Sequence, residues 1–238
     1  MTEPFRIELT IAAPADEVWQ ALRDPELIRR WHGWEIEDGG LDDEIDLIYR
    51  QHATETEPGR VLSLGDGTTF TLDDGGDDGG TRIRMVRGPR GGNPEWDEYY
   101  DDITEGWVTF LHQLRFAVER HAGVDRRTLF FSGAPGPAGE PRTALGLDRI
   151  TAEPGQAYRT DLVGEPVTGQ VWFRSTRQTG LSVDGWGDGL VIVGTAPPSA
   201  QRPHPQAMAV LTTYGLADKE FDELAERWRT WWEQTFTS

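Results

Sequence analysis

The chain has 238 residues, with 41 acidic and 23 basic side chains and a formal net charge of −18. Because so acidic a chain repels phosphate backbones and anionic headgroups, we expect neither nucleic acid nor a membrane surface as its partner. The sequence has no cysteine, which excludes disulfides, thiolate metal sites and a cysteine nucleophile.

The sequence contains no apolar run of about eighteen residues, the length that a membrane-spanning helix needs. Its first ten residues, MTEPFRIELT, lack the basic and apolar regions of a secretory signal. We therefore expect no membrane insertion and a cytoplasmic location, with which the absence of cysteine agrees.

The first 86 residues read as one strand, two short helices and several further strands. Residues 5–11 alternate between apolar and polar side chains, which predicts a half-buried strand. Apolar residues at helical spacing predict short helices around residues 18–22 and 27–31. The pair Asp24-Pro25 separates them, since a residue before proline avoids the α region. Further strands are predicted at 44–49, 60–64, 68–72 and 81–86.

The segment DDGGDDGG, residues 73–80, offers four carboxylates and raises the question of a calcium loop. It lacks the alternating ligand spacing and the terminal glutamate of the common calcium-binding loop. Its position between two predicted strands favours a hairpin turn instead, because Asp-Gly steps adopt positive φ at little cost.

A long helix is predicted over residues 98–120, and the preceding strands are expected to pack against it. Its apolar side chains recur at spacings of three and four and form one stripe: Tyr100, Ile103, Trp107, Phe110, Leu111, Leu114 and Val118. The sequence therefore predicts an α+β fold in which a curved antiparallel sheet packs around a long C-terminal helix.

Three segments of this first half resemble a known family: AAPADEVWQALRDPELIRRWHGWEIE, GTRIRMVRG and WDEYYDDITEGWVTFLHQLRFAVE. Over residues 3–122 the chain resembles the activator of heat-shock-protein-90 ATPase homologue family, which belongs to the START-like (SRPBCC) superfamily. The resemblance implies a helix-grip fold with a cavity between sheet and helix. It also implies that an apolar or amphipathic small molecule binds in that cavity.

The second half is interpreted as a degenerate tandem copy, giving domains 1–122 and 123–238. A shift of 121 positions places YDDITEGWVTFL, residues 100–111, on FDELAERWRTWW, residues 221–232. Strands are predicted at 170–174, 181–183 and 190–193, whereas Gly139, Pro141 and Gly146 weaken the first helix of this copy. The alternative is a single mixed domain with an unrelated appendage. A tandem pair would act as a monomeric pseudo-dimer, and a homodimer is the other possible state.

Aromatic and apolar side chains of the first half are the candidates for a ligand-binding cavity. The residues expected to line it are Trp31, Trp34, Phe70, Met85, Trp107 and Leu111. The alternative is that the same side chains fill a closed core, which for any single tryptophan is the more common outcome. A cavity is favoured for the group because few side chains can close the space beneath a helix on a curved sheet.

No catalytic constellation is visible, and we predict no catalytic residue, metal or cofactor. The five histidines have no metal-ligand spacing, and no serine elbow, phosphate loop or dinucleotide motif occurs. An enzyme of the cyclase or hydrolase kind stays an alternative that needs a polar group such as Tyr49, His52 or Arg84 in the cavity. A co-chaperone-like interaction module is a third reading, for which the 27 acidic and 12 basic side chains of residues 1–122 offer an acidic surface.

Overall fold

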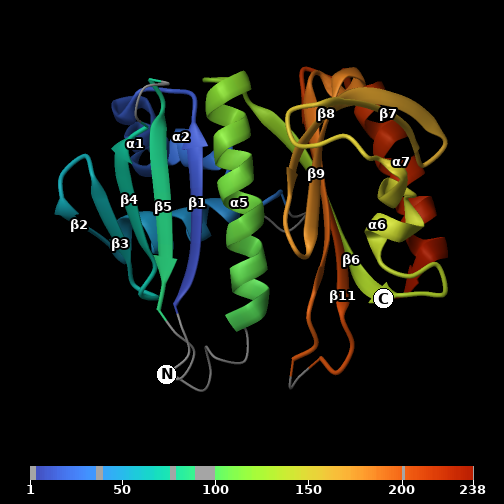
Figure 1. Ribbon diagram of the computed structural model, residues 1–238, viewed down its shortest axis with the longest axis horizontal. Coiled ribbons are helices and arrows are strands. Elements are labelled where there is room, and N and C mark those ends of the chain that lie inside the picture. The colour runs from blue at the N-terminus through green and yellow to red at the C-terminus, as the bar shows by residue number, and fades with distance from the viewer. Residues whose placement is uncertain (1–3, 36–39, 76–78, 89–99, 200–201, 238) are drawn as a thin grey trace. The chain divides into compact units, whose positions relative to one another are not determined.

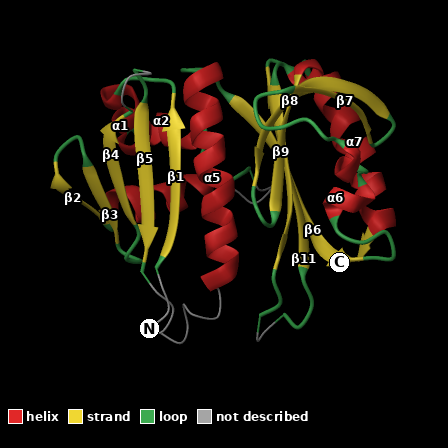
Figure 2. Ribbon diagram, viewed as in Figure 1, coloured by secondary structure: helices red, strands yellow, loops and turns green. Residues whose placement is uncertain are grey.

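The computed structural model describes residues 4–35, 40–75, 79–88, 100–199 and 202–237. The chain divides into two compact units, residues 1–124 (unit 1) and 125–238 (unit 2). Each unit combines one antiparallel sheet with one long helix at its C-terminal end (Figures 1 and 2). No helix in the described ranges is both long enough and apolar enough to cross a membrane.

Unit 1 has five strands in the order β1-β5-β4-β3-β2, so that its first strand pairs with its last. Within the described residues its helices are α1 (Ala15–Arg23), α2 (Pro25–Arg29), α3 (Leu41–Asp46), the π-helical turn η1 (Leu47–Gln51) and α5 (Tyr100–Arg120). The strands are β1 (Phe5–Ile11), β2 (Ala53–Glu57), β3 (Val61–Leu64), β4 (Thr69–Asp74) and β5 (Thr81–Arg87). The predicted fold class, an antiparallel sheet around a long C-terminal helix, is confirmed.

The break between α1 and α2 falls at the predicted proline. Asp24 is extended, with φ −81° and ψ 117°, and its side chain accepts a hydrogen bond from the Glu26 backbone N–H. Pro25 occupies the first position of α2, where a missing N–H costs nothing. The chain therefore turns sharply here, and Trp31 just beyond α2 reaches back to donate a hydrogen bond to the Ala21 carbonyl at 2.8 Å.

The strand predicted at residues 44–49 is wrong, because this stretch is helical and forms part of α3 and η1. Leu41, Ile45 and Tyr49 are buried at a spacing of four, while Leu47 between them is 46% exposed. A strand would have placed residues 45, 47 and 49 on one face. Apolar residues do alternate in this segment, but the side chains that enter the core are those spaced four apart along the helix.

The β4–β5 hairpin lies where the DDGGDDGG turn was predicted, and its flanking residues Gly75 and Gly80 are joined by a backbone hydrogen bond of 2.7 Å. Residues 76–78 lie outside the described ranges. On β5, Ile83 and Met85 are buried while Arg82 and Arg84 lie on the other face, as their alternation predicts.

Unit 2 has seven strands in the order β12-β6-β11-β10-β9-β8-β7. The strands are β6 (Arg126–Pro135), β7 (Ala157–Leu162), β8 (Glu165–Arg174), β9 (Gln178–Val183), β10 (Gly189–Ala196), β11 (Gln206–Tyr214) and β12 (Phe236–Thr237). The helices are α6 (Pro141–Ala144), the 3-10 turns η3 (Leu147–Arg149) and η4 (Asp184–Trp186), and α7 (Asp218–Thr235). The strands predicted at 170–174, 181–183 and 190–193 cover only parts of β8, β9 and β10, and β7, β11 and β12 were not predicted.

The two units share one order of elements: a first strand, short helices, an antiparallel meander and a long helix. In each, the first strand pairs with the last strand of the meander, β1 with β5 and β6 with β11. Trp107 of α5 and Trp228 of α7, which the 121-residue shift superposes, are both buried in the core of their own unit. The helix α6 has only four residues, as Gly139, Pro141 and Gly146 predict.

Candidate functional site

The predicted cavity residues of unit 1 lie together in its core. Trp31, Phe70, Met85, Trp107 and Leu111 are between 0% and 4% exposed and belong to one hydrophobic cluster. The Trp107 ring lies 5.3 Å from the Phe70 ring and 5.8 Å from the Phe110 ring. Trp34 is half-buried, with its ring 5.9 Å from that of Phe110. The structure thus brings all six to one region, and their role in ligand binding stays a prediction.

A polar network is embedded in this aromatic cluster, and of its members the sequence singled out only Tyr49. His32 is 1% exposed, and its Nδ1 lies 3.0 Å from the hydroxyl of the fully buried Tyr49. Its Nε2 lies 3.2 Å from Glu44 Oε1, whose side chain is half exposed. The His32 ring contacts those of Trp31, Tyr49, Trp107 and Phe110. A chain of hydrogen bonds therefore runs from a surface carboxylate to a phenol in the core.

The ionisation of two members of this network is shifted by their surroundings. The hydrogen bond from His32 holds the pKa of Glu44 below its ordinary value, against the opposing effect of burial. Burial, together with the negative charges of Glu44 and Asp66, raises the pKa of Tyr49 well above its ordinary value. The Tyr49 hydroxyl is therefore neutral at physiological pH.

Of the three polar residues that the enzyme alternative named, the structure places only Tyr49 in this cluster. His52 is exposed. Arg84 lies on the outer face of β5, where it pairs with Glu8 at 3.0 Å and Asp73 at 3.7 Å. The alternation of β5 fixes this, because Ile83 and Met85 occupy the inner face.

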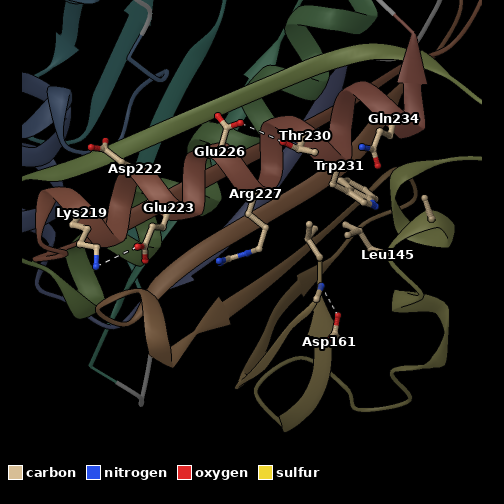
Figure 3. Close-up of a pocket in the computed structure, with 13 residues that line it drawn as sticks. Leu145, Asp161, Lys219, Asp222, Glu223, Glu226, Arg227, Thr230, Trp231 and Gln234 are labelled. Atoms are coloured by element: carbon tan, nitrogen blue, oxygen red, sulfur yellow. Dashed lines mark hydrogen bonds and ion pairs between the residues drawn. The ribbon is translucent and has the colours of Figure 1, made fainter.

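Unit 2 carries an open groove of about 1070 Å³ beside α7, which we call the α7 groove (Figure 3). Two rows of α7 residues at a spacing of four form one wall: Lys219, Glu223, Arg227 and Trp231, and next to them Asp222, Glu226, Thr230 and Gln234. Ala144 and Leu145 near the end of α6, and Asp161, Val163 and Gly164 of the β7–β8 hairpin, form the remainder. None of the six predicted cavity residues lines it.

The wall of the α7 groove combines apolar surface with paired charges. In Figure 3, Arg227 and Trp231 extend from α7 toward the side where Leu145 and Asp161 lie. Arg227 is paired with Glu165 at the start of β8, and the indole N–H of Trp186 reaches the same carboxylate at 3.4 Å. Lys219 is paired with Glu223 at 3.6 Å, so both basic side chains of the groove already have a carboxylate partner.

The hairpin that forms the opposite wall holds a valine in an unusual conformation. Val163 has φ 54°, a left-handed value that β-branched residues rarely adopt, and Gly164 follows with φ 78°. The Asp161 side chain stabilises the turn by accepting a hydrogen bond from the Gly164 N–H at 2.7 Å. Leu162 pairs with Glu165, so Val163 and Gly164 are the central residues of a two-residue hairpin turn, in which positive φ at both positions matches the twist of the strands. Sequence reasoning missed the groove, although the four-residue spacing of Lys219, Glu223, Arg227 and Trp231 is a readable signal.

Comparison with known proteins finds no matching family model and no matching curated protein. Solved structures similar to the whole chain include DynU16, from the dynemicin biosynthetic locus, at 18% identity over 98% of this chain and 96% of that one, with a TM-score of 0.35. The di-domain ARO/CYC StfQ of the steffimycin biosynthetic pathway is 12% identical over 97% and 94% of the two chains, with a TM-score of 0.34.

A third similar structure covers half of the chain. The Aha1 protein from Colwellia psychrerythraea, solved as a dimer, is 15% identical over 51% of this chain and 99% of its own, with a TM-score of 0.36. Since these identities lie below 25% and these TM-scores below 0.5, the three similarities carry no argument about family or function.

Proposed function

We propose that the protein binds an amphipathic small molecule, and that the α7 groove of unit 2 is the binding site. The observation that carries the proposal is a groove of about 1070 Å³ with apolar and polar side chains on facing walls. Small-molecule sites typically enclose on the order of 300–1,000 Å³ and combine apolar walls with a few polar groups.

The apolar part of the groove is built from Leu145, Val163 and Trp231. Leu145 is 8% exposed and belongs to the core of unit 2, whereas Val163 and Trp231 are only partly buried and keep apolar surface open.

The proposed site differs from the sequence-based one in its unit but not in its kind of location. Both lie beside the long helix that ends a helix-grip unit. We infer that the two units are tandem copies, and the shared strand order and the paired Trp107 and Trp228 support this inference. Ligand binding in unit 1, within the aromatic cluster, stays a separate prediction.

The enzyme alternative has one observation in its favour, the His32–Tyr49 hydrogen bond with Glu44 behind it. A general acid or base must come within hydrogen-bond reach of its substrate. Because Tyr49 is 0% and His32 1% exposed, we assign the network to packing and stability rather than to catalysis. The interaction-module alternative is supported by the resemblance and by the acidic surface of unit 1 alone.

The test introduces a bulky side chain into the α7 groove and leaves the buried core residues of unit 2 unchanged. Thr230→Trp places a bulky side chain at an exposed position of the wall, and Glu233→Trp is the matched control at an exposed position of α7 outside it. Binding of the neutral dye Nile red is titrated with both variants, and native mass spectrometry records any co-purifying molecule. We expect Thr230→Trp alone to lose binding at least tenfold. Equal binding by both variants would place the ligand elsewhere and refute the proposed site.

A further inference from the structure

We propose that the ligand of the α7 groove is an aromatic or aliphatic amine, held as its ammonium ion. This inference rests on the proposed function, because it specifies the chemistry that the same groove recognises. Three features of the groove favour such a ligand: the charge balance of its wall, the pairing of its basic side chains and the aromatic side chain at one end.

Carboxylates outnumber basic side chains along the groove. Four carboxylates line the groove, those of Asp161, Asp222, Glu223 and Glu226, against the two cations Lys219 and Arg227. Charges of one sign along a concave wall raise the local concentration of a ligand of the other sign. A cationic ligand is therefore favoured over an anionic one before any direct contact forms.

Both basic side chains of the groove are already paired with carboxylates. Arg227 is paired with Glu165, Lys219 with Glu223, and Glu226 with Arg229 at 2.8 Å. An anionic ligand would have to break one of these pairs to gain a partner. Asp161 and Asp222 make no ion pair within the described residues, and Asp161 uses only one oxygen, Oδ1, to accept from Gly164. An ammonium ion thus finds a carboxylate without displacing another cation.

The groove also favours a ligand with an apolar body. Trp231 lies twelve residues beyond Lys219 on α7, which at about 1.5 Å per residue is roughly 18 Å away. The aromatic end of the groove is therefore remote from the lysine, and Arg227, the groove-lining cation nearer to Trp231, is neutralised by Glu165. Tryptophan attracts cations over its ring face and offers a flat apolar surface. Amines with an aromatic or branched aliphatic body match both properties.

The test uses three probes of one shape and different charge: 2-naphthylmethylamine, 2-naphthalenemethanol and 2-naphthoate. Each is titrated by calorimetry into the full-length protein at pH 7 and low salt. We expect the amine to bind about tenfold more tightly than the alcohol and the naphthoate to bind most weakly. The preference should shrink at high salt, because partly exposed ion pairs are screened.

Variants locate the preference. Asp161→Asn keeps the acceptor for Gly164 but removes the charge, and combined with Asp222→Asn it should reduce the amine preference to less than twofold. Glu233→Gln is the matched control, since Glu233 is an exposed carboxylate of α7 that does not line the groove. Trp231→Ala should weaken all three probes.

The outcomes separate the two levels of the proposal. Tighter binding of the amine that Asp161→Asn/Asp222→Asn abolishes, and Glu233→Gln keeps, supports the inference. Equal or tighter binding of the alcohol or the naphthoate overturns the assignment to amines and leaves the groove as a binding site. Failure of all three probes to bind at millimolar concentration overturns both the inference and the proposed function.

Discussion

The hydroxyl of Tyr49 lies 3.0 Å from Nδ1 of His32, and both side chains are fully buried among the aromatic rings of unit 1. The two residues come from different elements, because His32 follows α2 and Tyr49 lies in η1. Their hydrogen bond therefore joins the short helical segments of unit 1 inside its core.

Tyr49→Phe should destabilise the protein by about 1–3 kcal/mol, because it leaves a buried ring nitrogen of His32 without this partner. The measurement is urea unfolding of the full-length chain. His32→Leu alone and with Tyr49→Phe completes a double-mutant cycle. A coupling energy of about 0.5–3 kcal/mol is expected for groups in direct contact, and additive effects would contradict the assigned hydrogen bond.

The stability that Glu44 contributes should depend on pH in one direction. The hydrogen bond from His32 lowers the pKa of Glu44 in the folded protein, so its ionised form stabilises the fold above the ordinary carboxyl range. This contribution is lost as pH falls through the lowered pKa. Glu44→Gln should therefore be less stable than the parent at pH 7, and the difference should shrink as pH falls below the ordinary carboxyl range.

The control for this pH series is Asp43→Asn, a neighbouring carboxylate of α3 that is exposed and makes no hydrogen bond to His32 in the described part of the chain. Unfolding midpoints are compared at pH 7, 5 and 3. A Glu44→Gln deficit that stays constant across the series would show that charge at this position is irrelevant.

Val163→Asn should stabilise unit 2 by about 1 kcal/mol, because asparagine tolerates the left-handed region far better than a β-branched residue. The same change removes apolar surface from the α7 groove, so Nile red affinity should fall while the midpoint of thermal unfolding rises. Val124→Asn, at a valine that is 44% exposed and has no positive φ, should change neither. A lower midpoint for Val163→Asn would mean that packing of the valine outweighs its strain.

Trp107→Ala and Trp228→Ala should each cost about 3–5 kcal/mol, because both remove a fully buried indole from the core of its unit. The tandem interpretation adds that the two costs should be similar. Chemical unfolding followed by hydrogen exchange in each unit measures them, since a two-unit protein need not unfold in one step. Trp107→Phe and Trp228→Phe serve as milder controls, and a negligible loss for either alanine variant would contradict its place in the core.

Elements with a long hydrophobic period, or with a proline at their boundary, could be predicted from the sequence alone. The stripe from Tyr100 to Val118 could only be one face of a helix, and Asp24-Pro25 marked the break between α1 and α2. The alternation of Ile83 and Met85 with two arginines fixed which face of β5 enters the core. These patterns act over neighbours in the chain, so no partner was needed to read them.

Short or continuous apolar runs do not distinguish a helix from a strand, and their conformation depends on packing with distant parts of the chain. Residues 45–49 alternate like a strand, yet the burial of Leu41, Ile45 and Tyr49 makes them helical. The run in β11 has no period at all, because its residues are buried on both faces.

The candidate sites depended on tertiary structure even more. The His32–Tyr49 bond joins residues seventeen apart, and the α7 groove joins a helix to a hairpin more than fifty residues earlier. Sequence patterns predict which face of a helix or strand a side chain occupies, whereas a binding site forms where the faces of different elements come into contact. Strand order and helix packing set these contacts, and in this protein they place the charged face of α7 beside the β7–β8 hairpin, where the candidate binding site lies.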